Sequence, residues 1–330
     1  MKKAPHNNYL TLLLMTCMAL FSTTVFSQDA QLSKAQLVGW IESLSNWGRW
    51  GAEDEKGTLN LITPETRKAA ATLVESGISV SMAHDTLVEE ALDNFSPYEH
   101  EMSAVGGGRS PWAMDRFGVS FHGYAHSHLD AVCHRFHEGK MYNGFADTEV
   151  TSEGCNKLDI TVAEDGIFGR GVLMDIPRLK GVDWLEPGTP IMPEDLLAWE
   201  RESGVTLRSG DIVLIRTGRW ARRAALGPWN VAEISAGLHA SAVALLHERD
   251  VALVGSDVAA DVFPSQVEGY THPVHVLLLI ALGTPIFDNL DLEDVATEAA
   301  NQNRWEFLFT AAPLRIPGGT GSPLNPIATF

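Results

Sequence analysis

The 330-residue chain has few cysteines and few basic residues, and each shortage excludes a class of protein. Three cysteines are too few for a small fold held together by disulfides. Lysine and arginine together number 24, against 42 aspartates and glutamates, which gives a net charge of −18. Bulk charge does not draw so acidic a chain to nucleic acid or to an anionic membrane surface. We therefore expect no nucleic-acid partner.

Two common catalytic motifs are also missing. The chain has no Gly-x-Ser-x-Gly segment, which argues against a serine hydrolase of that type. The glycines at 106–108 lack a strand before them and a helix after them, and those at 318–321 lack the lysine and the following helix of a phosphate-binding loop. The chemistry is therefore expected from other residues.

The chain opens with the layout of a secretory signal peptide. Two lysines precede an apolar run at 10–20, and a stretch of small residues follows and ends at Ser27. The run is shorter than the ~20 apolar residues of a transmembrane helix. We predict that residues 1–27 are removed on export. The mature protein, residues 28–330, is then a single domain that is periplasmic or secreted and makes no membrane contact.

Removal of that segment leaves two cysteines, Cys133 and Cys155. An oxidising compartment permits a disulfide between them. Because Cys133 lies inside a histidine-rich segment, however, a buried free thiol is the favoured interpretation.

Apolar periodicity and capping signals predict alternating helices and strands over the mature chain. The predicted helices cover residues 37–44, 64–74, 193–203, 238–249, 275–282 and 293–302. The predicted strands cover residues 78–82, 117–130, 172–176, 212–217, 251–254, 285–287 and 307–310, with loops at 93–115 and 317–326. This alternation indicates an α/β or mixed fold with several strands in the sheet.

Four histidines and one aspartate within the 13 residues 122–134 are the strongest chemical signal. Side chains of a strand point alternately to its two faces. In an extended segment, one face would therefore carry His122, Tyr124, His126, His128 and Asp130. Two imidazoles and a carboxylate that converge on one point suit Zn, Mn or Fe(II). We interpret His126, His128 and Asp130 as metal ligands, and His134 as a residue that reaches a water molecule at the metal.

This segment resembles the motif of the cyclase family, whose members include kynurenine formamidase-like and isatin hydrolase-like enzymes. The family pattern is His-x-Gly-Thr-His-x-Asp-Ala-Pro-x-His, and residues 127–134 align with its later part without a gap. The resemblance implies that His128 and Asp130 are metal ligands and that His134 is the catalytic histidine.

The family's first ligand histidine falls on Tyr124 in this chain. We therefore assign that place to His126, which lies on the same predicted face, and keep His122 as the alternative.

A later stretch matches the remaining family ligands, a histidine and a glutamate. His275 is the best match to the histidine, and Asp288 stands at the glutamate position with a side chain one methylene shorter. A turn or capping role before Leu290 is the alternative for Asp288. Asp257 and Asp261 follow a predicted strand and either orient ligand histidines or cap helices.

The resemblance covers nearly all of the mature chain. It implies a swivelling β/β/α domain with a mixed sheet and helices packed outside it, assembled as a dimer or tetramer. It also implies a Zn- or Mn-dependent hydrolase that opens an amide, cyclic amide or lactone in a small-molecule substrate, with His134 as general acid and base. Two other classes stay open: a metal-dependent cyclase or lyase acting on a polyketide-like carbonyl substrate, and an exported metal-binding protein without catalysis.

Overall fold

The computed structural model describes residue 1, residues 31–107 and residues 111–330. The predicted signal peptide, apart from Met1, lies outside these described residues. Among them, no helix is both long and apolar enough to cross a membrane.

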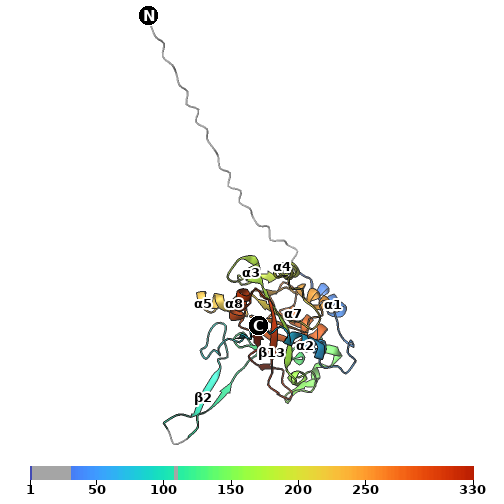
Figure 1. The fold of residues 1–330 in the computed structure, drawn as a ribbon. Helices are drawn as coiled ribbons and strands as arrows, with labels where there is room; N and C mark the ends of the chain where they lie inside the picture. The colour runs from blue at the N-terminus through green and yellow to red at the C-terminus, as the bar shows by residue number, and fades with distance from the viewer. Residues whose placement is uncertain (2–30, 108–110) are drawn as a thin grey trace. The chain divides into compact units, whose positions relative to one another are not determined.

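A nine-stranded mixed sheet organises the described residues (Figure 1). In spatial order its strands are β1 (Ser79–Ser81), β15 (Ile327–Thr329), β13 (Glu306–Ala311), β7 (Ile167–Asp175), β9 (Ile212–Arg216), β11 (Leu253–Ser256), β12 (Ile286–Asp288), β4 (His128–Asp130) and β14 (Gly321–Pro323). The four central strands β7, β9, β11 and β12 run parallel to one another. The strand pairs on either side of these four are antiparallel. Three further pairs join β8 (Pro190–Ile191) to β10 (Gly237–Leu238), β2 (Glu99–Ala104) to β3 (Met114–Gly118), and β5 (Val150–Thr151) to β6 (Gly154–Cys155).

Helices pack around the large sheet. The α-helices are α1 (Lys34–Ser43), α2 (Pro64–Ala71), α3 (Ile176–Lys180), α4 (Pro193–Ser203), α5 (Arg219–Leu226), α6 (Ala242–Glu248), α7 (Pro273–His275) and α8 (Glu293–Gln302). Shorter 3₁₀ turns are η2 (Gly57–Leu61), η3 (Val132–His134), η4 (Tyr142–Gly144), η5 (Asp147–Glu149) and η6 (Ile160–Ala163), and η7 (Val276–Leu282) is a π-helix. The predicted cap of α2 is confirmed, because the Thr63 side chain accepts a hydrogen bond from the backbone N–H of Thr66.

The parallel strands and η7 form the core. Every residue of β9, β11 and η7 is buried. Parallel strands are covered on both faces, so their sequences read as continuous apolar runs rather than as alternating patterns. The predicted α/β class, with a mixed sheet and helices outside it, is confirmed.

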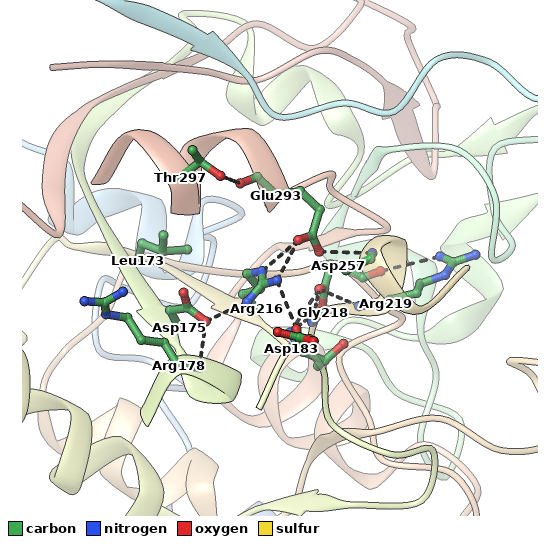
Figure 2. Close-up of polar contacts among 12 residues, drawn as sticks. Leu173, Asp175, Arg178, Asp183, Arg216, Gly218, Arg219, Asp257, Glu293 and Thr297 are labelled. Atoms are coloured by element: carbon green, nitrogen blue, oxygen red, sulfur yellow. Dashed lines mark hydrogen bonds and ion pairs between the residues drawn. The ribbon is translucent and has the colours of Figure 1, made fainter. Parts of the chain in front are cut away.

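A charged network lies where β7 and β9 end (Figure 2). Arg216, the last residue of β9, donates hydrogen bonds to Asp175 at 2.8 Å and to Glu293, the first residue of α8, at 2.6 Å. A buried charge is tolerated only when it is paired, so this network holds α8 against the sheet. In the same region the carboxylate of Asp257 accepts a hydrogen bond from the backbone N–H of Gly218 at 2.8 Å.

Two sequence predictions fail between residues 93 and 130. The predicted loop at 93–115 contains β2, which pairs with β3 in a hairpin that projects from the large sheet (Figure 1). The predicted strand at 117–130 is interrupted: its first two residues end β3, residues 119–127 are not in a strand, and only β4 at its end joins the large sheet. All but the last residues of β2 and β3 are exposed on both faces, so their sequences show no alternation of apolar and polar residues. Similarly, the predicted loop at 317–326 contains β14.

Candidate metal centre

The centre is built on β4 and its neighbour β12. His128 and Asp130 point to one face of β4, and Leu129 is buried on the other. Strand β12 pairs antiparallel with β4 so that Asp288 lies directly opposite His128. This register brings together two carboxylates and an imidazole from segments that are 158 residues apart in the chain. All three side chains are almost fully buried.

Two further histidines approach Asp130 from the segments on either side of β4. The Nδ1 of His122 lies 3.0 Å from Asp130 Oδ1, and its Nε2 is hydrogen-bonded to Thr320 Oγ1 at 2.8 Å. Turn η3 places His134 Nε2 3.9 Å from Asp130 Oδ2. The His122 and His134 rings stack 4.0 Å apart. A Cβ at Gly321 would come within 3.1 Å of the His122 ring, so the close approach of β14 needs glycine here.

His275 completes the cluster from α7. Its Nε2 lies 3.7 Å from Asp130 Oδ2 and 3.4 Å from Asp288 Oδ2. Its Nδ1 donates to Asp261 Oδ2 at 2.6 Å, and the same carboxylate accepts the backbone N–H of Val274. Asp261 thereby fixes the His275 ring with Nε2 directed to the centre, which is how carboxylates orient histidine ligands. The two predicted roles of Asp261, capping and orientation, are both present.

These residues fit a divalent metal. Their ligand atoms form two groups, His122–Asp130–His134 and His128–Asp130–Asp288, each within 4.8 Å and both sharing Asp130. Ligands ~2.0–2.2 Å from one ion lie roughly 3–3.6 Å from each other, so small side-chain shifts suffice. His122 Nδ1 and Asp130 Oδ1 lie 3.0 Å apart, and Asp288 Oδ1 is buried without a hydrogen bond. Such an orphaned atom is rare in folded proteins, and a shared cation satisfies all three.

The electric field of the centre also favours a cation. Burial lowers the pKa of His128 and of His275, yet nearby carboxylates outweigh burial and raise both pKa values above the usual range. Burial raises the pKa of Asp130, but His134, His122 and His128 bring it well below its ordinary value. The carboxylates therefore stabilise positive charge at this place, whether it is carried by protons or by a metal ion.

His134 differs from the other histidines. Burial lowers its pKa to about 4, although Asp130 raises it and the other histidines lower it further. This is well below the ordinary pKa of a histidine side chain, about 6.5. At pH 7 the imidazole is neutral, and with 31% of its side chain exposed it is accessible from the cavity. It can accept a proton there.

His126 does not join the cluster, which corrects the predicted ligand set. Residues 119–127 are not in a strand, and 122–126 form bends, so the alternation of a strand does not hold over them. The Nε2 of His126 instead accepts the backbone N–H of Leu87 at 3.3 Å, and its ring lies 6.3 Å from that of Tyr98 beside a different cavity. His122, the alternative, occupies the place expected for the first ligand histidine.

A cavity of about 270 Å³ opens onto the centre. Beyond the cluster, its lining includes Tyr124, Arg135 and His272. Burial raises the pKa of Tyr124, and Asp288 and Asp261 raise it further. Neither His272 nor Arg135 is among the residues predicted for the site. The position of Arg135, directly after the predicted catalytic histidine, was the available signal.

Cys133 and Cys155 form a disulfide, with their Cα atoms 6.6 Å apart. The predicted free thiol is therefore wrong. Turn η3 directs Cys133 away from the metal cluster: its backbone N–H donates to Leu158 O, in the segment that follows Cys155. The bridge ties the segment that carries His134 to the β5–β6 hairpin.

Comparison with known proteins shows which family this chain belongs to. A family model described as "Putative cyclase" matches residues 78–261, more than half of the chain. The chain belongs to the cyclase family. A crystal structure of a novel cyclase is 34% identical in sequence, with a TM-score of 0.78, and the match covers 88% of this chain and 99% of that one.

Two isatin hydrolases share the fold at lower identity. Isatin hydrolase A from Labrenzia aggregata, bound to benzyl benzoate, is 22% identical with a TM-score of 0.56, over 79% of this chain and 96% of that one. Isatin hydrolase A from Ralstonia solanacearum is 22% identical with a TM-score of 0.55, over 81% and 98%. No curated protein matches the chain. The family model and the crystal structure of the novel cyclase confirm the predicted family.

Proposed function

We propose that this protein is a metal-dependent hydrolase that opens an amide, cyclic amide or lactone. One observation carries the proposal: histidines and buried carboxylates converge on a small cavity, with ligand atoms in two groups that share Asp130. Membership of the cyclase family supports it.

The metal would be held by His128, Asp130, His275 and Asp288, with His122 in the place first assigned to His126. Zn or Mn suits this mixture of imidazole and carboxylate ligands. When bound, such an ion lowers the pKa of a water molecule toward ~7 and polarises a carbonyl group.

His134 supplies the proton transfer. Its neutral imidazole accepts a proton from the attacking water and returns it to the leaving nitrogen or oxygen, as general base and then general acid. The low pKa, about 4, keeps the ring free to accept that proton throughout the neutral range. Asp130 lies close enough to stabilise the imidazolium that forms between the two steps.

The cavity volume of about 270 Å³ favours a small-molecule substrate. We also propose that the protein is exported to the periplasm or secreted. The disulfide supports this location, since such bonds persist in oxidising compartments. The predicted dimer or tetramer stays a prediction.

Elemental analysis of the purified protein tests the metal site. We expect about one or two equivalents of Zn or Mn in the wild type, and loss of metal in His128→Ala and Asp130→Ala. His126→Ala is the matched control, because this histidine lies outside the cluster and should leave the metal content unchanged. A wild type that neither contains nor takes up metal would refute the proposal.

Turnover separates the hydrolase from its two alternatives. Formamides, cyclic imides and lactones are incubated in ¹⁸O-labelled water, with His134→Ala beside the wild type. Hydrolysis places one labelled oxygen in the acid product, whereas a cyclase or lyase product carries none. A protein that binds metal without turnover consumes none of the substrates. We expect His134→Ala to retain metal and to lose at least 100-fold in rate.

A further inference from the structure

The proposed function leaves one charged side chain of the cavity without a role. Arg135 lines the cavity, and its Nε is buried without a hydrogen-bond partner. Among residues 31–107 and 111–330, none of the ion pairs with an acidic side chain includes Arg135. A buried donor of a cationic group normally has a partner, because desolvating it without one costs free energy.

The guanidinium lies close to the metal cluster. Arg135 and His272 line the same cavity as the cluster. The His272 ring in turn packs edge-on against His275, with the centroids 5.6 Å apart. Arg135 therefore borders the cavity into which the proposed metal ligands point.

The acidic groups of the cavity face histidines. Asp130 faces His122, His128 and His134, and Asp288 faces His275. A metal bound by these carboxylates would add positive charge to the cavity that Arg135 also lines, and like charges in a partly buried site repel each other. An anion from outside the protein, seated beside Arg135, removes this repulsion and satisfies the orphaned donor.

Building on the proposed function, we propose that Arg135 binds a carboxylate group of the substrate, separate from the bond that is cleaved. The guanidinium fork matches the geometry of a carboxylate. A phosphate dianion suits the site less well, because Asp130 and Asp288 line the same cavity. The substrate class is therefore a small amide or lactone that carries a free carboxylate.

Binding of dicarboxylates to the metal-loaded protein tests this without turnover. Benzoate offers one carboxylate, which the metal can take, whereas phthalate, isophthalate and terephthalate offer a second one at three different spans. We expect at least one of the three to bind about 10-fold or more tightly than benzoate, as measured by isothermal titration calorimetry. In Arg135→Met this gain should disappear while benzoate affinity stays close to that of the wild type, and Arg135→Lys should keep part of the gain.

Arg201→Met is the control, because it removes one positive charge from the exposed face of α4 and should leave the gain intact. Arg135 makes no bond that folding depends on, and a thermal melt of Arg135→Met checks this. The proposal is overturned if no dicarboxylate binds more tightly than benzoate, or if the gain survives in Arg135→Met. Elemental analysis reports on the proposed function separately. If the protein holds no metal, Arg135 can still bind the single carboxylate of benzoate. Benzoate affinity would then fall in Arg135→Met.

Discussion

Replacing Asp261 by asparagine should weaken metal binding without removing any proposed ligand. Asp261 accepts the Nδ1 proton of His275 at 2.6 Å. An asparagine that turns its NH₂ group to the ring would drive the proton to Nε2, the atom that faces Asp130 and Asp288. A hydrogen bond to a charged group contributes about 1.5–3 kcal/mol, so we expect metal affinity to fall about 10- to 100-fold.

Asp257→Asn is the matched control for Asp261→Asn. Asp257 is also buried and lies four residues earlier, but its carboxylate accepts backbone N–H groups of Thr217 and Gly218 at 2.8–3.0 Å and contacts no histidine (Figure 2). This variant should unfold more easily and still bind metal as the wild type does. The assay is competition with a chelator of known affinity. Equal losses of affinity in both variants, or none in Asp261→Asn, would refute the positioning role.

Three further predictions address pH and stability. Burial raises the pKa of Asp211 to about 6, so the folded protein binds a proton that the unfolded chain releases near pH 4. The contribution of Asp211 to the free energy of unfolding should therefore fall by up to about 3 kcal/mol as the pH rises from 4 to 6. Urea unfolding at several pH values should show this decrease in the wild type and not in Asp211→Asn. Replacing both Cys133 and Cys155 by serine should lower the free energy of unfolding by about 3 kcal/mol, and equal unfolding midpoints in the two proteins would contradict this. Because the pKa of His275 is raised well above its ordinary value, protons compete with the metal. Metal affinity should therefore rise from pH 6 to pH 8, with proton release measurable on binding, and a constant affinity would contradict the ligand assignment.

Local signals predicted some helices closely, whereas α3 and α5 were not predicted. The bounds of α4 and α8 agree with prediction at both ends, because proline or acidic residues mark their first turns and a residue in the left-handed conformation follows their last. The hairpin of β2 and β3 was missed for the opposite reason. It buries neither face, so its sequence has no apolar period to detect.

In the site, too, residues close together in the sequence were predicted, whereas the pairing of distant segments was not. His128 and Asp130 were predictable because they share one strand, β4, and one face of it. The error at His126 came from extending that strand beyond the residues that pair. The pairing of β4 with β12 and β14 joins residues far apart in the chain, and no local pattern records this register. The family resemblance supplied His275 and Asp288, whereas the only signal for Arg135 was its place directly after His134.

The position of β4 between β12 and β14 has a consequence for how the protein acquires its metal. Strand β14 ends at Pro323, and His122 is held by Thr320, so the centre cannot assemble until nearly the whole chain has been synthesised. A chain that crosses a membrane before folding would build this centre only at its destination. The supply of ions in that compartment, together with the ligand set, would then determine which metal occupies the finished protein.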